Sequence, residues 1–167
     1  MAHASCQKLF MALLISLGVF AMDQITKVLV VHYWPQGYRR VVLENGFDFV
    51  HWRNTGAAWG MFDGHPFILG VISVTVFILM LVFFRTLTEE HRLQEVGFGL
   101  ILGGVAGNLL DRFARGSVVD FLFFYHNSFQ WPAFNVADSG ITVGVTIYVG
   151  SVFWHSYTAK KQGAKTA

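Results

Sequence analysis

The chain has few residues that could cross-link it, kink its helices or charge its surface. Cys6 is the single cysteine among 167 residues, which excludes an internal disulfide framework and a cysteine-rich metal site. The three prolines lie outside the long apolar runs, as continuous helices require. Charged residues make up 13% of the chain, whereas a typical soluble domain has about 25%. With a mean hydropathy of +0.49, this composition excludes an ordinary soluble domain.

Two further classes have little support. The net charge of +2 is small and scattered, which argues against nucleic acid as a partner. The seven histidines show no paired ligand spacing, and the HExxH pattern is absent. We therefore expect neither a metal nor another cofactor.

Four apolar runs approach the roughly 20 residues that a helix needs to cross a bilayer. They cover about residues 9–31, 67–84, 96–115 and 135–157. The first continues past Asp23 and Lys27 and has no small-residue cleavage site, so we interpret it as a retained helix rather than a signal peptide. The pattern predicts one integral-membrane domain over residues 1–167, mainly α-helical, with four transmembrane helices and both termini on one side.

The positive-inside rule decides the orientation only narrowly. Cytoplasmic termini would put six basic residues inside: Lys8, Arg85, Arg92, Lys160, Lys161 and Lys165. Five would lie on the opposite side: Arg39, Arg40, Arg53, Arg112 and Arg115. The lysines that follow the fourth run favour cytoplasmic termini.

The segment between the first two runs predicts a small sheet at the membrane surface, at about residues 41–62. Two stretches rich in β-branched and aromatic residues flank Asn45-Gly46, the strongest short-range hairpin signal. The small residues at 54–58 either let another chain approach the backbone or form a plain turn.

The third run carries the pattern that lets membrane helices pack closely. Gly99, Gly103 and Gly107 recur every four residues. Asn108, Asp111 and Arg112 follow on the same helix, where Arg112 serves either a site or the helix dipole and headgroups. Asp23 and Lys27 on the first run are spaced for an i,i+4 ion pair, which could be purely structural.

Asp120 and Asp138 are the strongest candidates for catalytic residues. Apolar residues surround each, and an acid at a membrane edge is a functional candidate by default. Two carboxylates at one apolar site resist joint ionisation, so one can act as a base while the other remains an acid. Asp138 could instead complete a capping box with Asn135. The aromatic stretch at 116–134 between them suits a segment at the headgroup level.

Five blocks, in order, resemble the lipoprotein signal peptidases, the type II signal peptidases of bacteria. They are DQITK at 23–27, NTGAA at 54–58, GGVAGNLLDR at 103–112, VVDF at 118–121 and FNVADS at 134–139. Trp59 and Gly60 depart from the family's usual Phe and Ser, which puts the tip of the expected sheet in doubt. The resemblance implies four transmembrane helices with a small periplasmic β-cradle between helices 1 and 2.

The resemblance also implies an aspartyl endopeptidase of the bacterial inner membrane, with Asp120 and Asp138 as its catalytic pair. Its substrates would be diacylglyceryl-modified prolipoproteins, cut on the N-terminal side of the modified cysteine near the periplasmic face. Lipidated precursor and membrane lipid would be its partners, and we expect a monomer. The implied substrate-binding residues are Asp23, Lys27, Asn54, Gly56, Asn108, Arg112, Asn135 and Ala137.

Two other classes stay open at this stage. One is a small proton-coupled transporter subunit that uses its intramembrane aspartates as a relay. Transporters usually show internal repeats and broken helices, and neither is visible here. The other is a non-catalytic assembly factor that packs through its glycine-rich helix.

Overall fold

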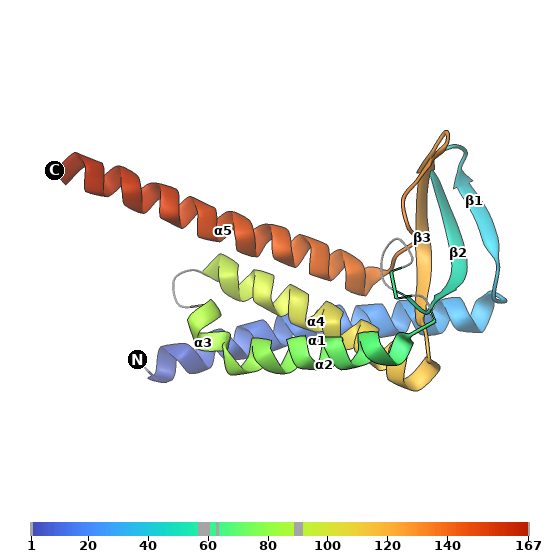
Figure 1. Ribbon diagram of the computed structural model, residues 1–167, viewed down its shortest axis with the longest axis horizontal. Helices are drawn as coiled ribbons and strands as arrows, with labels where there is room; N and C mark the ends of the chain where they lie inside the picture. Colours follow the sequence, from blue (N-terminus) through green and yellow to red (C-terminus); the bar gives the residue numbers. More distant parts are fainter. Residues whose placement is uncertain (1, 57–60, 63, 89–91, 167) are drawn as a thin grey trace.

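The computed structural model describes residues 2–56, 61–62, 64–88 and 92–166 of the chain, so the expected sheet tip at Trp59 and Gly60 lies outside the described residues. The helices are α1 Ala2–Tyr33, α2 Pro66–Val82, α3 Phe84–Leu87, α4 Arg92–Arg115 and α5 Val136–Thr166. They run lengthwise along the molecule, and a small sheet stands across one end (Figure 1). Both termini lie at the other end.

Three of these helices are long and apolar enough to cross a membrane, by length and composition: Gln7–Tyr33, Arg92–Arg115 and Val136–Lys161. The second apolar run, at 67–84, forms a shorter helix, since α2 ends at Val82 and the single turn α3 follows. The expected helices at 96–115 and 135–157 extend further in the structure, from Arg92 and to Thr166 respectively.

Helix α4 lies at the centre, where it packs most extensively against α5 and α1. The glycine pattern explains this closeness. A Cβ on Gly103 would lie 2.5 Å from the carbonyl oxygen of Ser16 on α1, and one on Gly99 would lie 2.6 Å from that of Ala12. Contacts this short are incompatible with any side chain, so the predicted packing role of the stripe is confirmed.

The sheet is antiparallel with the order β1-β2-β3-β4, from Arg39–Leu43, Phe47–Asn54, Val118–His126 and Phe129–Gln130. The predicted hairpin at Asn45-Gly46 is confirmed: Leu43 pairs with Phe47, and Asn45 has a positive φ of 56°. The aromatic stretch at 116–134 supplies β3 and β4, and its expected place at the headgroup level stays a prediction. It completes the sheet because its edge pairs with β2, a partner about 70 residues away that no local signal reveals.

An apolar cluster fixes β3 to the end of α1. It contains Val30, Val119 and Phe121, all at most 7% exposed, with Val136 packed against it. These contacts hold the start of β3 and the start of α5 close to the same end of α4. The two predicted catalytic aspartates lie on these two starts.

Candidate active site

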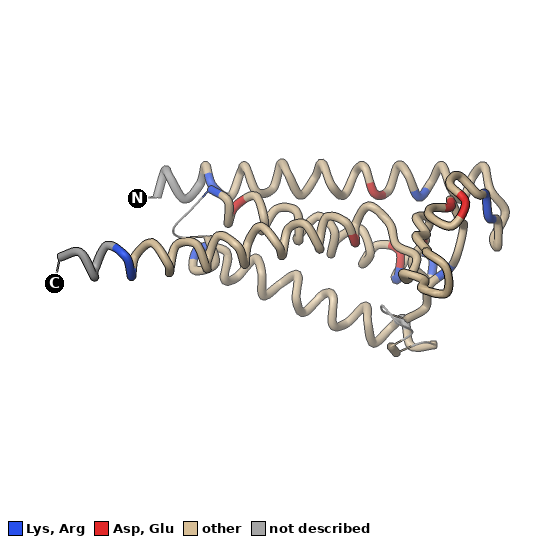
Figure 2. The backbone as a smooth tube through the Cα atoms, turned by 90° about the horizontal axis from the view of Figure 1, so that it is seen from above, with Lys and Arg blue, Asp and Glu red and all other residues tan. Residues whose placement is uncertain are grey.

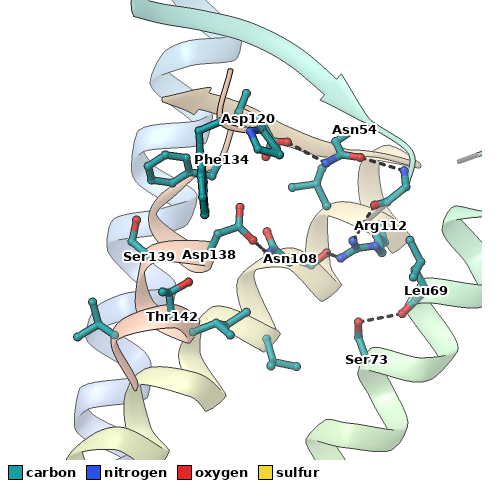
Figure 3. Close-up of a pocket in the computed structure, with 18 residues that line it drawn as sticks. Asn54, Leu69, Ser73, Asn108, Arg112, Asp120, Phe134, Asp138, Ser139 and Thr142 are labelled. Carbon is teal, nitrogen blue, oxygen red and sulfur yellow. Dashed lines mark hydrogen bonds between the residues drawn. The ribbon is translucent and has the colours of Figure 1, made fainter. Parts of the chain in front are cut away.

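Asp120 and Asp138 line one cavity of about 640 Å³, although they come from different elements. Asp120 lies on β3, and Asp138 lies in the first turn of α5. Their side chains point into the same space, with Asn108 of α4 and Asn54 of β2 beside them (Figure 3). The fold therefore brings together the two acids that the sequence singled out.

Each carboxylate oxygen of this pair accepts one N–H hydrogen bond. Asn108 Nδ2 donates to Asp138 Oδ1 over 2.7 Å, and the Asn135 amide donates to Asp138 Oδ2 over 3.2 Å. Asn135 Nδ2 donates to Asp120 Oδ1 over 2.8 Å, and Asn54 Nδ2 donates to Asp120 Oδ2 over 3.0 Å. The four donors fix both carboxyl groups and leave lone pairs for a further ligand.

Asn135 joins the two acids because it also starts α5. Its Oδ1 accepts the Asp138 amide over 3.0 Å while its own amide donates to Asp138 Oδ2. This reciprocal pattern is the predicted capping box, which is thereby confirmed. Capping and cavity exposure do not compete at Asp138, since the carboxyl group does both.

Asn54 is oriented by its own turn. Its Oδ1 accepts the Gly56 amide over 3.0 Å, which leaves Nδ2 to face Asp120. Gly56 in turn offers its carbonyl oxygen to Arg112 Nη2 over 3.2 Å. Among the described residues, the buried Nε of Arg112 has no partner.

The environment of Asp120 favours a proton on its carboxyl group. Burial raises the pKa of Asp120 to about 7, and the nearby negative charge of Asp138 adds to the shift. The hydrogen bonds from Asn54 and Asn135 oppose it. One of the two acids can thus hold a proton at neutral pH.

A buried ion cluster lies behind the cavity and ties the elements together. Lys27 Nζ lies 2.8 Å from Asp23 Oδ2 and 3.0 Å from Asp111 Oδ2, and all three side chains are fully buried. The predicted pairing of Asp23 with Lys27 is confirmed. Lys27 also donates to Asn108 Oδ1 over 3.0 Å, which orients the amide that holds Asp138.

The same cluster binds backbone from two other elements. Asp23 Oδ1 accepts the Ala137 amide of α5 over 2.9 Å, and Asp111 Oδ2 accepts the Val119 amide of β3 over 3.1 Å. Arg115 forms a close ion pair with Asp111 and also bonds Gln24. Two carboxylates and two cations balance, so the buried charges are compensated.

The eight predicted substrate-binding residues therefore divide into two groups. Asn54, Gly56, Asn108 and Arg112 line the cavity. Asp23, Lys27, Asn135 and Ala137 do not, because each is fully buried. These four hold groups that face the cavity, and their predicted role in substrate binding stays a prediction.

Several cavity residues were missed by the sequence analysis. One wall is mostly apolar and comes from α2, α4 and α5: Leu69, Ser73, Val105, Ile141, Thr142 and Val143. Helix α2 packs against α4 and barely contacts α5, so this wall lies between two helices that are apart. Its only signal in the sequence is general hydrophobicity, which does not distinguish a cavity wall from a lipid-facing surface.

Over the part of the chain that the structure describes, no three His, Cys, Asp or Glu side chains gather in an arrangement that could hold a metal ion. The expectation that the protein needs no metal stays a prediction.

Comparison with known proteins gives one consistent result. Residues 15–154 match the family model described as signal peptidase (SPase) II. A lipoprotein signal peptidase of Geobacillus kaustophilus is 40% identical over 146 residues, which are 87% of this chain and 95% of the relative. That of Bacillus subtilis is 36% identical over 149 residues, with 89% and 97% covered.

Solved structures agree. A bacterial membrane enzyme determined at 2.3 Å resolution superposes with a TM-score of 0.77 at 28% identity, over 87% of this chain and 88% of that one. A second, determined at 1.9 Å, gives 0.71 at 30% identity over 84% and 91%.

These matches correct the transporter alternative, because the family model and the curated relatives are peptidases. The likeness covers most of the chain, including every element that carries a cavity residue. The chain belongs to the signal peptidase II family.

Proposed function

We propose that this protein is an aspartyl endopeptidase that removes the signal peptide from diacylglyceryl-modified prolipoproteins. Cleavage falls on the N-terminal side of the modified cysteine. The observation that carries the proposal is the pair of carboxyl groups, Asp120 and Asp138, in one cavity of a membrane-type fold. The names of the relatives, lipoprotein signal peptidases, support the choice of substrate.

The two acids have different surroundings, which supports a division of roles. Asp138 lies in the first turn of α5, where the helix dipole stabilises a carboxylate. Asp120 lies on a strand and has a pKa of about 7, raised first by burial. We assign the base to Asp138 and the acid to Asp120.

In the first step, Asp138 takes a proton from a water molecule while the water oxygen attacks the scissile carbonyl carbon. The proton on Asp120 is shared with the carbonyl oxygen and stabilises the tetrahedral intermediate. The C–N bond then breaks, the departing amine takes the proton that Asp138 accepted, and the shared proton returns to Asp120 as the C=O bond re-forms. The transferred protons and the attacking water balance the hydrolysis.

The polar rim of the cavity suits an extended peptide. Arg112 lines the cavity and donates to two backbone carbonyls, those of Gly56 and Asn108. Asn54 fixes the acid that faces the same space. We assign substrate orientation to Asn54, Gly56, Asn108 and Arg112, because holding the scissile bond in place lowers the entropic part of the barrier.

We further propose that the protein is a monomer of the bacterial inner membrane that crosses it four times, with cytoplasmic termini and a periplasmic site. The termini lie at one end, while Asp120 and Asp138 lie near the other (Figures 1 and 3). Figure 2 shows basic segments close to both termini, and Lys8, Lys160 and Lys161 are near the ends of the sequence. The positive-inside rule favours that end in the cytoplasm.

The proposal predicts a strong requirement for the lipid. Each buried methylene contributes about 0.8 kcal/mol to membrane partitioning, so two acyl chains hold the cysteine at the membrane edge. The diacylglyceryl precursor should therefore be cut at least about 100-fold faster than the unmodified one, a difference of about 2.7 kcal/mol. Purified protein incubated with both precursors, followed by gel electrophoresis, measures this ratio. Equal rates would leave a membrane protease without lipid recognition.

A further inference from the structure

The sheet carries a second apolar hollow next to the active-site cavity. We name it the hairpin groove. It measures about 550 Å³ and is lined by Asn45, Gly46, Phe124, Tyr125, His126, Phe129, Trp131 and Phe134. Aromatic side chains thus make most of its surface, and neither a carboxylate nor a lysine or arginine lines it.

The hairpin groove adjoins the active-site cavity. Trp131 and Phe134 line both hollows. Successive side chains of a strand alternate between its two faces, so Phe124 shares the face of β3 that carries Asp120. The Phe124 and Phe134 rings stack with centroids 5.8 Å apart, which makes a shared apolar wall that leads away from the acid.

Three aromatic side chains of the groove expose apolar surface to water, which is unfavourable in free energy. Phe124 is 45% exposed, Phe129 57% and Trp131 51%. The turns of both hairpins extend beyond α5, which leaves this part of the sheet clear of the helices (Figure 1). An apolar ligand would cover this surface with a gain in free energy from each methylene removed from water.

The groove offers little to a peptide. A peptide that adds to a sheet needs free backbone donors and acceptors. Here the Tyr125 amide donates to Gly46 O over 3.0 Å, and the Trp131 amide donates to Phe124 O over 2.9 Å. The Phe134 amide and the Leu122 carbonyl oxygen are also paired, over 2.9 Å. The chemistry therefore favours a hydrocarbon chain.

We propose that the hairpin groove receives one acyl chain of the diacylglyceryl group. The chain passes from the modified cysteine, held at the dyad of Asp120 and Asp138, over Phe134 and then along Phe124 and Phe129. This inference rests on the proposed function and adds a specificity site for the length of the lipid chain. The signal peptide keeps the other apolar wall, between α2 and α5.

Kinetics with two lipid lengths test this. Phe129→Ser should lower kcat/KM for a precursor with two sixteen-carbon chains by about tenfold, or about 1.4 kcal/mol. For a precursor with two eight-carbon chains the loss should be under about twofold, since a short chain reaches less of the groove. Phe153→Ser is the matched control, because Phe153 is 71% exposed on α5 and lines neither hollow. It should change neither rate.

Equal losses for both lipid lengths, or none, would overturn the proposal. If Phe129→Ser unfolds, photo-crosslinking of the wild-type protein decides. A diazirine within an acyl chain should label residues of β3 and β4. Labels confined to α2 and α5 would contradict the assignment, as would labelling of the groove from a photoreactive residue of the mature peptide. Failure of the wild-type protein to cut any lipidated precursor would instead refute the proposed function.

Discussion

At the scale of single residues, two asparagines set the difference between the acids. Asn135 donates to both carboxyl groups, through its side chain to Asp120 and through its backbone to Asp138. Asn108 donates only to Asp138, and its own oxygen accepts from Lys27. Lys27 Nζ is thus connected to Asp138 through one amide, while its charge also opposes the raised pKa of Asp120. Asp120 has only amide donors, Asn54 and Asn135, and burial dominates its pKa.

This difference predicts the pH dependence of cleavage. Asp120 must be protonated, and its pKa is about 7, so kcat/KM should fall about tenfold for each pH unit above that value. Asn54→Ala removes a hydrogen bond that lowers this pKa, so the alkaline limb should move to higher pH even though the rate drops. Rates of precursor cleavage between pH 5 and 9 measure the alkaline limb of the wild-type protein and of Asn54→Ala. If the alkaline limb does not move in Asn54→Ala, the loss of activity at high pH comes from a group other than Asp120.

The same proton affects stability in a defined direction. The carboxyl group has an ordinary pKa of 3.8, and burial raises it in the folded protein. The folded state therefore binds more protons between these two pKa values, so the free energy of unfolding falls as the pH rises through this window. Activity and stability are both favoured on the acid side of neutrality.

At the scale of elements, α4 positions the site because its glycines let both neighbours approach. A Cβ on Gly107 would lie 2.5 Å from Asp23 Oδ2 on α1, and one on Gly104 would collide with the Ala137 carbonyl oxygen on α5. The backbone approach at Gly104 lies one residue from Asp138. Helix contact and dyad geometry are therefore coupled.

A single methyl group should expose this coupling. Gly104→Ala should push α5 from α4, lengthen the 2.7 Å bond between Asn108 and Asp138, and lower cleavage by more than about tenfold. Gly150→Ala is the control on α5, because nothing lies within 4 Å of a Cβ there. It should leave the rate unchanged and can raise the unfolding temperature, since alanine favours helix over glycine by about 1 kcal/mol. If Gly104→Ala and Gly150→Ala cleave at the same rate, the packing of α4 against α5 does not control catalysis.

How far the sequence predicts the structure depends on whether the signal is local. The Asn45-Gly46 turn, the Asp23 and Lys27 pair, and the Asn135 cap each involve residues within four positions, and each is confirmed. The pairing of β3 with β2 and the bond from Lys27 to Asp111 join distant segments, and neither was predicted. The apolar wall of α2 was missed because hydrophobicity alone does not show what a helix faces.

At the scale of the whole molecule, the candidate active site and the two termini lie at opposite ends. Figure 1 shows the sheet across one end of the helices and both termini at the other. The cavity reaches both the sheet and the apolar wall between α2 and α5. A substrate held in the bilayer could therefore reach the acids without leaving the membrane, which is consistent with a lipid-anchored precursor.

This arrangement predicts the topology. A fluorescent protein fused after Ala167 should fold and fluoresce, since it would remain in the cytoplasm. Alkaline phosphatase fused after Asn45, in the β1–β2 turn, should be active, because that enzyme requires the periplasm. Fusions at each site with the opposite reporter serve as controls. The reverse pattern of reporter activities would show that the protein has the opposite orientation in the membrane.

The most direct test of the central claim is the cleavage rate of dyad variants on a diacylglyceryl precursor. Asp120→Asn and Asp138→Asn should each lose at least about 100-fold in rate while remaining folded and membrane-inserted, because an amide cannot exchange the required proton. Asp111→Asn is the matched control. Asp111 is fully buried behind the cavity and binds Lys27 and the Val119 amide, so its variant should retain measurable cleavage. Substantial turnover in either dyad variant, or equal loss in folded Asp111→Asn, would contradict the assignment of Asp120 and Asp138 as the catalytic pair.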